Sequence, residues 1–350
     1  MAPEDTKFMK RALELATRGA GMVSPNPMVG AVIVSGGKVI GEGFHRFDLL
    51  RHAESYAIEQ AGDRARGATL YCNLEPCCHH GRTPPCTDAL MSAGVGRAVI
   101  ALTDPDPRVS GRGLEQLRAA GIVVDVGVCE DEARQLNEQY LKYISTGKPF
   151  IHSIVSPEGA QWAPSSQLLA QIGSYDALVL DGNTAVDEVF LRAFLAKACH
   201  RAPILLARSD RIMKIKSLVG ELAISHSASA HGEGPWPASA LGEDDGATQA
   251  LSGSVAAAQE TIQRVIIQTL GNPGALADDL IAAGATSAVV LGTDQESLGR
   301  LPDKVTVVSD RALERARRAG QIESTCVDLR DAVISAAGEF VEITGYPTAR

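Results

Sequence analysis

Four residues between positions 52 and 86 have side chains and spacings suited to metal-assisted chemistry. His52 and Glu54 stand two residues apart in HAE, and Cys77 and Cys86 each follow a proline in LEPCCHHGRTPPC. Zinc-dependent deamination of a nucleobase uses H-x-E with a downstream P-C-x-x-C, in which the histidine and both cysteines bind the metal. Here the two cysteines are separated by a longer interval of eight residues. The pattern predicts a zinc site with a carboxylate beside it.

Each residue type suits one task in a hydrolytic deamination. Zn²⁺ can lower the pKa of a bound water to about 7, and three protein ligands leave a fourth position for that water. A carboxylate then moves protons to a ring nitrogen and to the departing amine. Because helix positions two apart do not share a face, His52 can bind the metal while Glu54 faces the substrate. Cys77 and Cys86 are expected near helix starts, where the helix dipole favours thiolates.

Each part of this pattern also has a simpler interpretation. An isolated H-x-E usually lies on a solvated helix face, and Cys77 and Cys86 could be ordinary buried thiols. The main alternative is a closed structural zinc site made from Cys77, Cys86 and either His79 or His80. Such a site needs a fourth protein ligand and leaves Glu54 without a role. The combined pattern is more restrictive than its parts, so we favour the catalytic interpretation.

The first half of the chain is expected to alternate between strands and helices. Apolar periodicity predicts helices over 5–18, 52–63, about 83–93, 111–121 and 131–145, and strands over 68–74, 97–104 and 122–128, with a hairpin over 29–45. This alternation is typical of an α/β layer with a mostly parallel sheet. The run TDPDP (103–107) follows a strand, at the edge where open α/β sheets place ligands.

The second half begins after the turn-like TGKP (146–149) and has a similar pattern. We expect strands over 150–156, 175–182, 202–207, 264–270 and 286–292, and helices over 186–199 and 274–284. The predicted domains are therefore residues 1–146 and 147–350. The segment 231–254 is rich in Gly, Ser, Pro and Asp, which predicts a long exposed loop.

Composition narrows the class of protein. The 350 residues are 45% hydrophobic and 21% charged, which is typical of a soluble globular protein. No run approaches the ~18 apolar residues of a membrane span, and no secretory signal is visible at the N-terminus. The net charge of -9 argues against general binding to nucleic acid. Four of the seven cysteines lie between 72 and 86, which favours metal binding over a disulfide framework and predicts a cytoplasmic location.

Further segments complete the pattern of the first half: SPNPMVGAVIV, GEGFH, DPDPRVSGRG and LNEQYLKYISTGKPF, together with HAE and LEPCCHHGRTPPC. Through them the first half resembles the deaminase domain of the bifunctional riboflavin-biosynthesis deaminase/reductase family. The long CxHxGxTPPC loop is specific to that family, whereas nucleoside and tRNA deaminases carry the shorter PCxxC. The resemblance implies a three-layer α/β/α cytidine-deaminase-like domain followed by a dihydrofolate-reductase-like α/β domain.

The resemblance also implies a reaction and a set of site residues. The family's deaminase removes the 2-amino group of 2,5-diamino-6-ribosylamino-4(3H)-pyrimidinone 5′-phosphate as ammonia, giving 5-amino-6-ribosylaminouracil 5′-phosphate. By position, His52, Cys77 and Cys86 match the ligands of one zinc ion per chain, and Glu54 matches the proton shuttle. The positions that match contacts with the pyrimidine, ribose and phosphate are Asn26, His45, His79, Arg82, Asp104 and Asp106.

For one of these residues the chemistry of the side chain supports a binding role, and for others an ordinary structural role is the alternative. Arg82, in a Gly-flanked loop, is a natural ligand for a phosphate. Asn26 and His45 end apolar runs, where a turn or core role is the ordinary alternative. Asp104 and Asp106 could be turn formers next to prolines.

The second half departs from the family, in which this domain is an NADPH-dependent reductase of the ribosyl side chain. The family's lysine and SLDG become IHSIVSPEGA (151–160), its T-x-x-x-D-D-P-x-L becomes NTAVDEVFLRA (183–193), and its late glycine pair becomes LGTD (291–294). Dinucleotide binding needs glycines where the backbone approaches the pyrophosphate. We therefore expect no NADPH binding, and a reductase-like remnant that could supply a homodimer interface.

The leading hypothesis is a zinc-dependent pyrimidine deaminase whose second domain is catalytically silent. Its partner would be a small phosphorylated pyrimidine, without nucleic acid or membrane. The alternatives are a fully bifunctional deaminase/reductase, a nucleic-acid deaminase, and a zinc-stabilised binding protein without catalytic activity. The acidic charge and the loop type disfavour the nucleic-acid enzyme.

Overall fold

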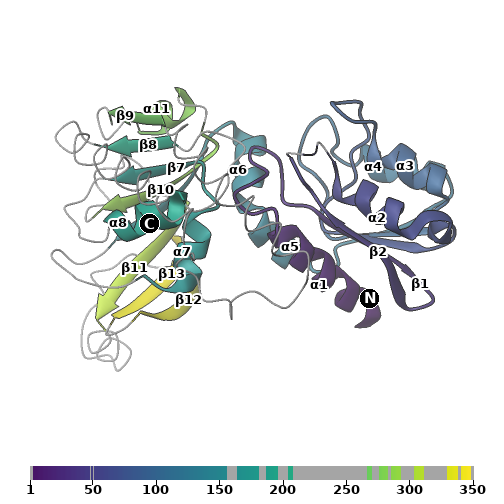
Figure 1. Ribbon diagram of the computed structural model, residues 1–350, viewed down its shortest axis with the longest axis horizontal. Helices are drawn as coiled ribbons and strands as arrows, with labels where there is room; N and C mark the ends of the chain where they lie inside the picture. Colours follow the sequence, from purple (N-terminus) through teal and green to yellow (C-terminus); the bar gives the residue numbers. More distant parts are fainter. Residues whose placement is uncertain are drawn as a thin grey trace, which may run out of the picture. The chain divides into compact units, whose positions relative to one another are not determined.

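The chain divides into two compact units, Met1–Gly147 and Lys148–Arg350, each with its own sheet, in the computed structural model (Figure 1). The residues described are 3–47, 49, 51–155, 164–180, 187–195, 204–207, 266–269, 276–282, 285–292, 303–310, 329–337 and 340–347. No helix within these ranges has the length and apolar content needed to span a lipid bilayer.

The first unit is built on a five-stranded sheet with the order β2-β1-β3-β4-β5. Its strands are β1 (Gly30–Ser35), β2 (Lys38–Phe44), β3 (Thr69–Cys72), β4 (Arg97–Ile100) and β5 (Val123–Val126). β1 pairs antiparallel with β2 and with β3, whereas β3 with β4 and β4 with β5 are parallel. The expectation of a mostly parallel sheet therefore holds on one side only, because the predicted hairpin adds antiparallel pairs on the other.

Helices cover both faces of this sheet. The helices on one face are α2 (Ala53–Ala61), α3 (Cys86–Ala93) and α4 (Arg112–Ala119), and those on the other are α1 (Pro3–Thr17), α5 (Glu130–Leu136) and α6 (Glu138–Thr146). Side chains along β1 alternate between the two faces, so both faces are apolar and need cover. Ala31 and Ile33 pack in the core on the side of α2, and Val32 and Val34 pack in the core on the side of α1. The predicted three-layer α/β/α arrangement is confirmed.

Helix α2, which contains Glu54, lies very close to β2. A Cβ atom added at Gly43 would overlap the carbonyl oxygen of Ala53 and lie 2.6 Å from the Cβ of Tyr56. One added at Gly41 would overlap the carbonyl oxygen of Ala57. The absence of side chains at Gly41 and Gly43 lets the helix backbone rest on the strand, which fixes the first turn of α2 against the sheet.

The single helix predicted over 131–145 is wrong, because α5 and α6 meet at Asn137. The Asn137 side chain is buried, and its Oδ1 accepts a hydrogen bond from the backbone N–H of Met28 at 2.8 Å. Its Nδ2 donates to the carbonyl oxygen of Met28 at 2.9 Å. This contact joins residues that are far apart in the sequence, so helical periodicity over 131–145 contains no sign of the break.

The second unit has an eight-stranded sheet with the order β12-β13-β11-β6-β10-β7-β8-β9. The predicted strands appear as β6 (Phe150–Val155), β7 (Ala177–Leu180), β8 (Ile204–Ala207), β9 (Ile266–Thr269) and β10 (Ser287–Gly292), and the predicted helices as α8 (Asp187–Leu195) and α11 (Leu276–Ala282). Not predicted were α7 (Ser166–Ile172), β11 (Lys304–Asp310), β12 (Leu329–Ala337) and β13 (Phe340–Pro347). β13 pairs antiparallel with both β11 and β12.

Several expectations for this half fall on residues that the structure does not describe. They are the loop predicted over 231–254 and the parts of the three departures from the family pattern at 156–160, 183–186 and 293–294.

Candidate metal centre and adjoining pocket

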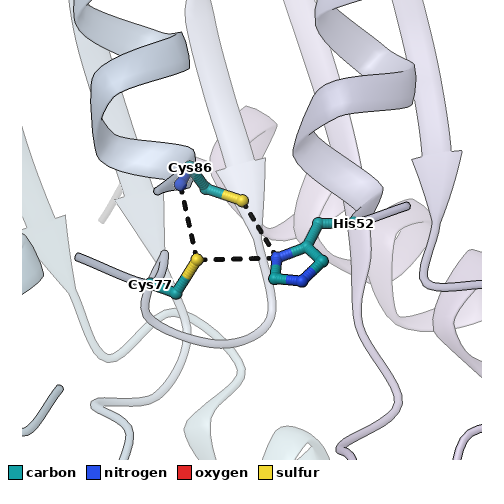
Figure 2. Close-up of side chains that lie close together, drawn as sticks. All are labelled: His52, Cys77 and Cys86. Atoms are coloured by element: carbon teal, nitrogen blue, oxygen red, sulfur yellow. Dashed lines mark hydrogen bonds between the residues drawn. The ribbon is translucent and has the colours of Figure 1, made fainter. Parts of the chain in front are cut away.

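His52 and Cys86 at the starts of two helices come together with Cys77 (Figure 2). Cys77 was expected near a helix start as well, but it lies in the loop between β3 and α3. His52 is the residue before α2, and Cys86 is the first residue of α3. The Nδ1 atom of His52 lies 3.2 Å from the sulfur of Cys86 and 3.5 Å from that of Cys77. The three possible ligand atoms all lie within 4.8 Å of one another. The second ring nitrogen, Nε2, lies 3.4 Å from the hydroxyl oxygen of Thr83, which can hold the ring in this orientation.

The three groups influence one another's protonation. Hydrogen bonding with Cys77 raises the pKa of His52 to about 9. The pKa of Cys77 is lowered by the hydrogen bond from the Cys86 thiol, and the backbone N–H of Cys86 also donates to the Cys77 sulfur at 3.4 Å. Pairing with Cys77 and burial raise the pKa of Cys86. The cluster therefore favours a thiolate at Cys77, the form in which cysteine binds metal.

This donor set fits a zinc ion with one coordination position left open. One imidazole nitrogen and two sulfurs are ligands that zinc prefers, and three protein ligands are typical of a catalytic rather than a structural site. Within the described part of the chain, no further His, Cys, Asp or Glu joins the group, so neither His79 nor His80 closes it. The closed structural site considered from the sequence is therefore not observed.

Glu54 lies in the first turn of α2, two residues after His52. Its side chain is only 3% exposed, yet it lines the cavity beside the three ligands. Burial raises the pKa of the Glu54 carboxyl group, and the nearby His52 partly opposes this shift. A carboxyl group with a raised pKa next to a metal centre is suited to accepting and returning a proton.

A cavity of about 560 Å³ adjoins the three ligands. Nine of the ten predicted site residues line it, and Cys86 is the one that does not: the nine are Asn26, His45, His52, Glu54, Cys77, His79, Arg82, Asp104 and Asp106. The predicted residues come from separate motifs spread over some eighty positions, yet they line one cavity. Its volume is typical of a small-molecule site.

The polar side chains Asn26, His45, His79 and Arg82, which line the cavity, differ in their contacts. The Nδ1 atom of His45 lies 3.0 Å from the carbonyl oxygen of Arg51, and its Nε2 lies 3.3 Å from Nδ2 of the exposed Asn26. His79 has a buried Nδ1 atom without a hydrogen-bond partner among the described residues. The guanidinium of Arg82 lies 5.7 Å from the centre of the Phe47 ring.

The two aspartates of the TDPDP run differ in their surroundings. Asp104 Oδ1 accepts hydrogen bonds from the hydroxyl of Tyr140 at 2.8 Å and from the backbone N–H of Asp106 at 2.9 Å. Burial raises the pKa of the Asp104 carboxyl group. The Asp106 carboxylate instead accepts a hydrogen bond from Nη2 of Arg108 at 2.6 Å, and this pairing lowers its pKa. Asp106 is thus engaged with a neighbouring residue of its own loop.

Other residues of the cavity wall were not identified from the sequence. They include Phe47, Glu75, Arg108 and Tyr140. Tyr140 stands on α6 with Tyr143 and Ile144, which also line the cavity, and the helical spacing of these apolar residues was a usable signal. Glu75, directly before Pro76-Cys77, carries no local sign of its role, because its partners lie about 30 to 40 residues later.

The sequence of the chain is similar to a known domain family and to known proteins of riboflavin biosynthesis. Residues 2–102 match the family model described as "Cytidine and deoxycytidylate deaminase zinc-binding region". The riboflavin biosynthesis protein RibD of Aquifex aeolicus (strain VF5) is 55% identical over 147 residues, which cover 42% of this chain and 41% of that protein. The chloroplastic riboflavin biosynthesis protein PYRD of Zea mays is 37% identical over 308 residues, which cover 87% of this chain and 77% of that protein.

Two solved structures resemble the chain over both units. One is a diaminohydroxyphosphoribosylaminopyrimidine deaminase/5-amino-6-(5-phosphoribosylamino)uracil reductase from Thermotoga maritima, with a TM-score of 0.69 and 25% identity. The other is RibD from Acinetobacter baumannii, with a TM-score of 0.63 and 26% identity. Each comparison covers 99% of both chains. The predicted fold class, a cytidine-deaminase-like domain joined to a second α/β domain, is confirmed.

Proposed function

Because the chain belongs to the RibD/PYRD family of riboflavin-biosynthesis proteins, we propose that it deaminates 2,5-diamino-6-ribosylamino-4(3H)-pyrimidinone 5′-phosphate. The observation that carries this proposal is the meeting of His52, Cys77 and Cys86 beside a cavity that buried Glu54 also lines. Residues 1–146 would form the deaminase domain. The product would be 5-amino-6-ribosylaminouracil 5′-phosphate, with ammonia as the leaving group.

The three ligands and Glu54 divide the chemistry between them. His52, Cys77 and Cys86 would hold one zinc ion, which when bound acts as a Lewis acid and lowers the pKa of water. Glu54 accepts a proton from the attacking water as the water oxygen bonds to the ring carbon that carries the 2-amino group. Glu54 gives this proton to the adjacent ring nitrogen, then takes the second proton from the new hydroxyl group on the ring carbon and gives it to the amine, whose C–N bond breaks to release ammonia as the carbonyl group forms.

The remaining polar residues of the cavity would bind and orient the substrate. Arg82 lies exposed at the cavity, where its planar guanidinium can pair with two oxygens of the 5′-phosphate. Asn26, His45 and His79 offer hydrogen-bonding atoms for the ring and the ribose. Asp104 has a second carboxylate oxygen that can accept from a substrate N–H or O–H, since Tyr140 and the backbone N–H of Asp106 both donate to Oδ1.

We further propose that residues 147–350 form a reductase-like domain without NADPH-dependent activity. The support is the sequence: the family's lysine and SLDG, its D-D-P run and its late glycine pair are all replaced. The clustered cysteines of the first unit suit a reducing compartment, which supports a cytoplasmic site of action.

One assay tests both parts of the proposal. The purified chain, loaded with zinc, is incubated with the diaminopyrimidinone phosphate and NADPH, and ammonia and NADPH are followed in the same sample. We expect ammonia release without NADPH consumption, and loss of ammonia release after treatment with a chelator. Consumption of NADPH together with ammonia release would favour the bifunctional alternative. Absence of ammonia from the zinc-loaded chain would refute the deaminase assignment.

A further inference from the structure

Glu75 is a buried carboxylate on which four backbone N–H groups converge. Its Oε1 accepts hydrogen bonds from Gly113 at 2.9 Å and Leu114 at 3.3 Å. Its Oε2 accepts from Gly111 at 2.9 Å and Asp104 at 3.2 Å. The side chain is only 4% exposed, so these bonds are shielded from water. Each oxygen thus has two donors, which fills the acceptor positions of the carboxylate.

Three of the four donors belong to the start of α4 (Arg112–Ala119). The first N–H groups of a helix have no partners within the helix, and a negative charge there is also favoured by the helix dipole. The residue before α4 is Gly111, which has no side chain to cap the helix. The Glu75 carboxylate caps the start of α4 instead, from a distant part of the chain. A Cβ added at Gly113 would overlap the carbonyl oxygen of Pro76, so α4 rests directly on the chain next to Glu75.

Glu75 stands between two groups of residues that the proposed reaction needs. Two positions later, Cys77 belongs to the candidate metal centre. On the other side, the segment 104–114 bound by the Glu75 carboxylate includes Asp104 and Asp106, which line the cavity. The backbone N–H of Glu75 also donates to the carbonyl oxygen of Leu102 at 2.9 Å, just before that segment.

We propose that Glu75 is a positioning residue that fixes the cavity wall at 104–114 relative to the metal-ligand loop at Cys77. This inference rests on the proposed function, and it assigns to Glu75 no contact with the reacting atoms. Two buried glutamates, Glu54 and Glu75, line the same cavity. Backbone N–H groups occupy all four acceptor positions of the Glu75 carboxylate, so its contacts are with the cavity wall and not with the substrate.

The test is Glu75→Gln in the full chain loaded with zinc. Whichever way the amide turns, its NH₂ group faces two N–H donors, so two of the four hydrogen bonds are lost. We expect faster hydrogen–deuterium exchange across residues 104–114 and one zinc still bound per chain. Because displacement of a reacting group by about 1 Å can reduce rates about 100-fold, we expect kcat/KM for the diaminopyrimidinone phosphate to fall by about that factor, with a raised KM.

A matched control separates positioning from general stability. Asp5 is another buried acid of the first unit, which accepts hydrogen bonds from Tyr71 at 2.9 Å and Arg97 at 2.8 Å and does not line the cavity. Asp5→Asn should lower the melting temperature but leave KM and the exchange of 104–114 unchanged. If Glu75→Gln does not fold, Gly113→Ala strains the same contact from the other side and is measured in the same way.

The exchange measurement does not depend on turnover. If the wild-type chain releases no ammonia, the proposed function fails, and the exchange of 104–114 alone decides whether Glu75 holds the wall. Exchange in Glu75→Gln no faster than in Asp5→Asn would overturn the inference. So would an unchanged KM and kcat in Glu75→Gln below its melting temperature.

Discussion

Removal of one hydroxyl group, in Tyr140→Phe, should weaken the first unit by an amount that depends on pH. The Tyr140 hydroxyl donates to Asp104 Oδ1 at 2.8 Å, and the Asp104 side chain is 6% exposed. A hydrogen bond to a charged group contributes about 1.5–3 kcal/mol, against about 1 kcal/mol between neutral groups. We therefore expect the free energy of unfolding to fall by about 2 kcal/mol at a pH where Asp104 is ionised.

The sign of the pH dependence follows from the burial of Asp104. Burial raises the folded-state pKa of this carboxyl group above its ordinary value, so stability present at low pH is lost as the pH rises through that pKa. The Tyr140 hydrogen bond favours the ionised form and limits this loss. In Tyr140→Phe the loss on raising the pH should therefore be larger. Below the folded-state pKa the difference between variant and wild type should shrink to about 1 kcal/mol.

Chemical denaturation followed by circular dichroism, at neutral and at acidic pH, measures this difference. Hydrogen exchange at the amides of α6 assigns the change to the first unit. Tyr143→Phe is the matched control, because Tyr143 lines the cavity from the same helix and its hydroxyl has no side-chain hydrogen bond within the described ranges. Equal losses in the two variants, or a Tyr140→Phe loss that grows on acidification, would refute the reasoning.

Three further predictions concern the metal ligands, the second unit and the packing of α2. Cys77→Ser should reduce bound zinc, measured by metal analysis, well below one ion per chain. Cys78→Ser is the control and should keep its zinc, because the Cys78 sulfur lies 3.7 Å from the carbonyl oxygen of Arg108 and is not one of the three grouped ligands. Burial lowers the pKa of His152 to about 3. The free energy of unfolding should therefore fall by up to about 1.4 kcal/mol for each pH unit as the pH is lowered from 6.5 to 3. His152→Gln should remove this dependence in denaturation curves at several pH values, and a curve that keeps its slope would contradict the assignment. Gly43→Ala should reduce both stability, by about 1–3 kcal/mol, and zinc affinity, because the added methyl group displaces the first turn of α2.

The sequence was sufficient for the parts of the site that depend on residue type and short spacing. The helix predicted from His52 begins one residue later, at Ala53, with Glu54 in its first turn, and TPPC placed Cys86 at the start of α3. The strands and helices of the first unit were predicted, apart from the break between α5 and α6, because each has its own apolar periodicity. The gathering of the predicted residues around one cavity followed from the position of their motifs at strand ends and helix starts.

The features that sequence reasoning missed depend on contacts between distant residues. The break at Asn137 is made by Met28, 109 positions earlier. The role of Glu75 depends on N–H groups of residues 104–114, and the pairing of Asp106 with Arg108 depends on the local path of the loop. The C-terminal strands β11 to β13 were not recognised, and no strand or helix was predicted after residue 292. Periodicity describes one element at a time, and these features join several.

The most direct test of the account compares Glu54→Gln with the wild-type chain, both loaded with zinc, in ammonia release from the diaminopyrimidinone phosphate. Glu59→Gln is the control, since Glu59 lies on the same helix with a side chain that is 60% exposed and paired with Arg51. We predict that Glu54→Gln keeps one zinc ion per chain and releases ammonia about 10²–10⁴-fold more slowly, while Glu59→Gln resembles the wild type. Full activity in zinc-loaded Glu54→Gln would contradict the central claim that this buried carboxyl group moves the protons.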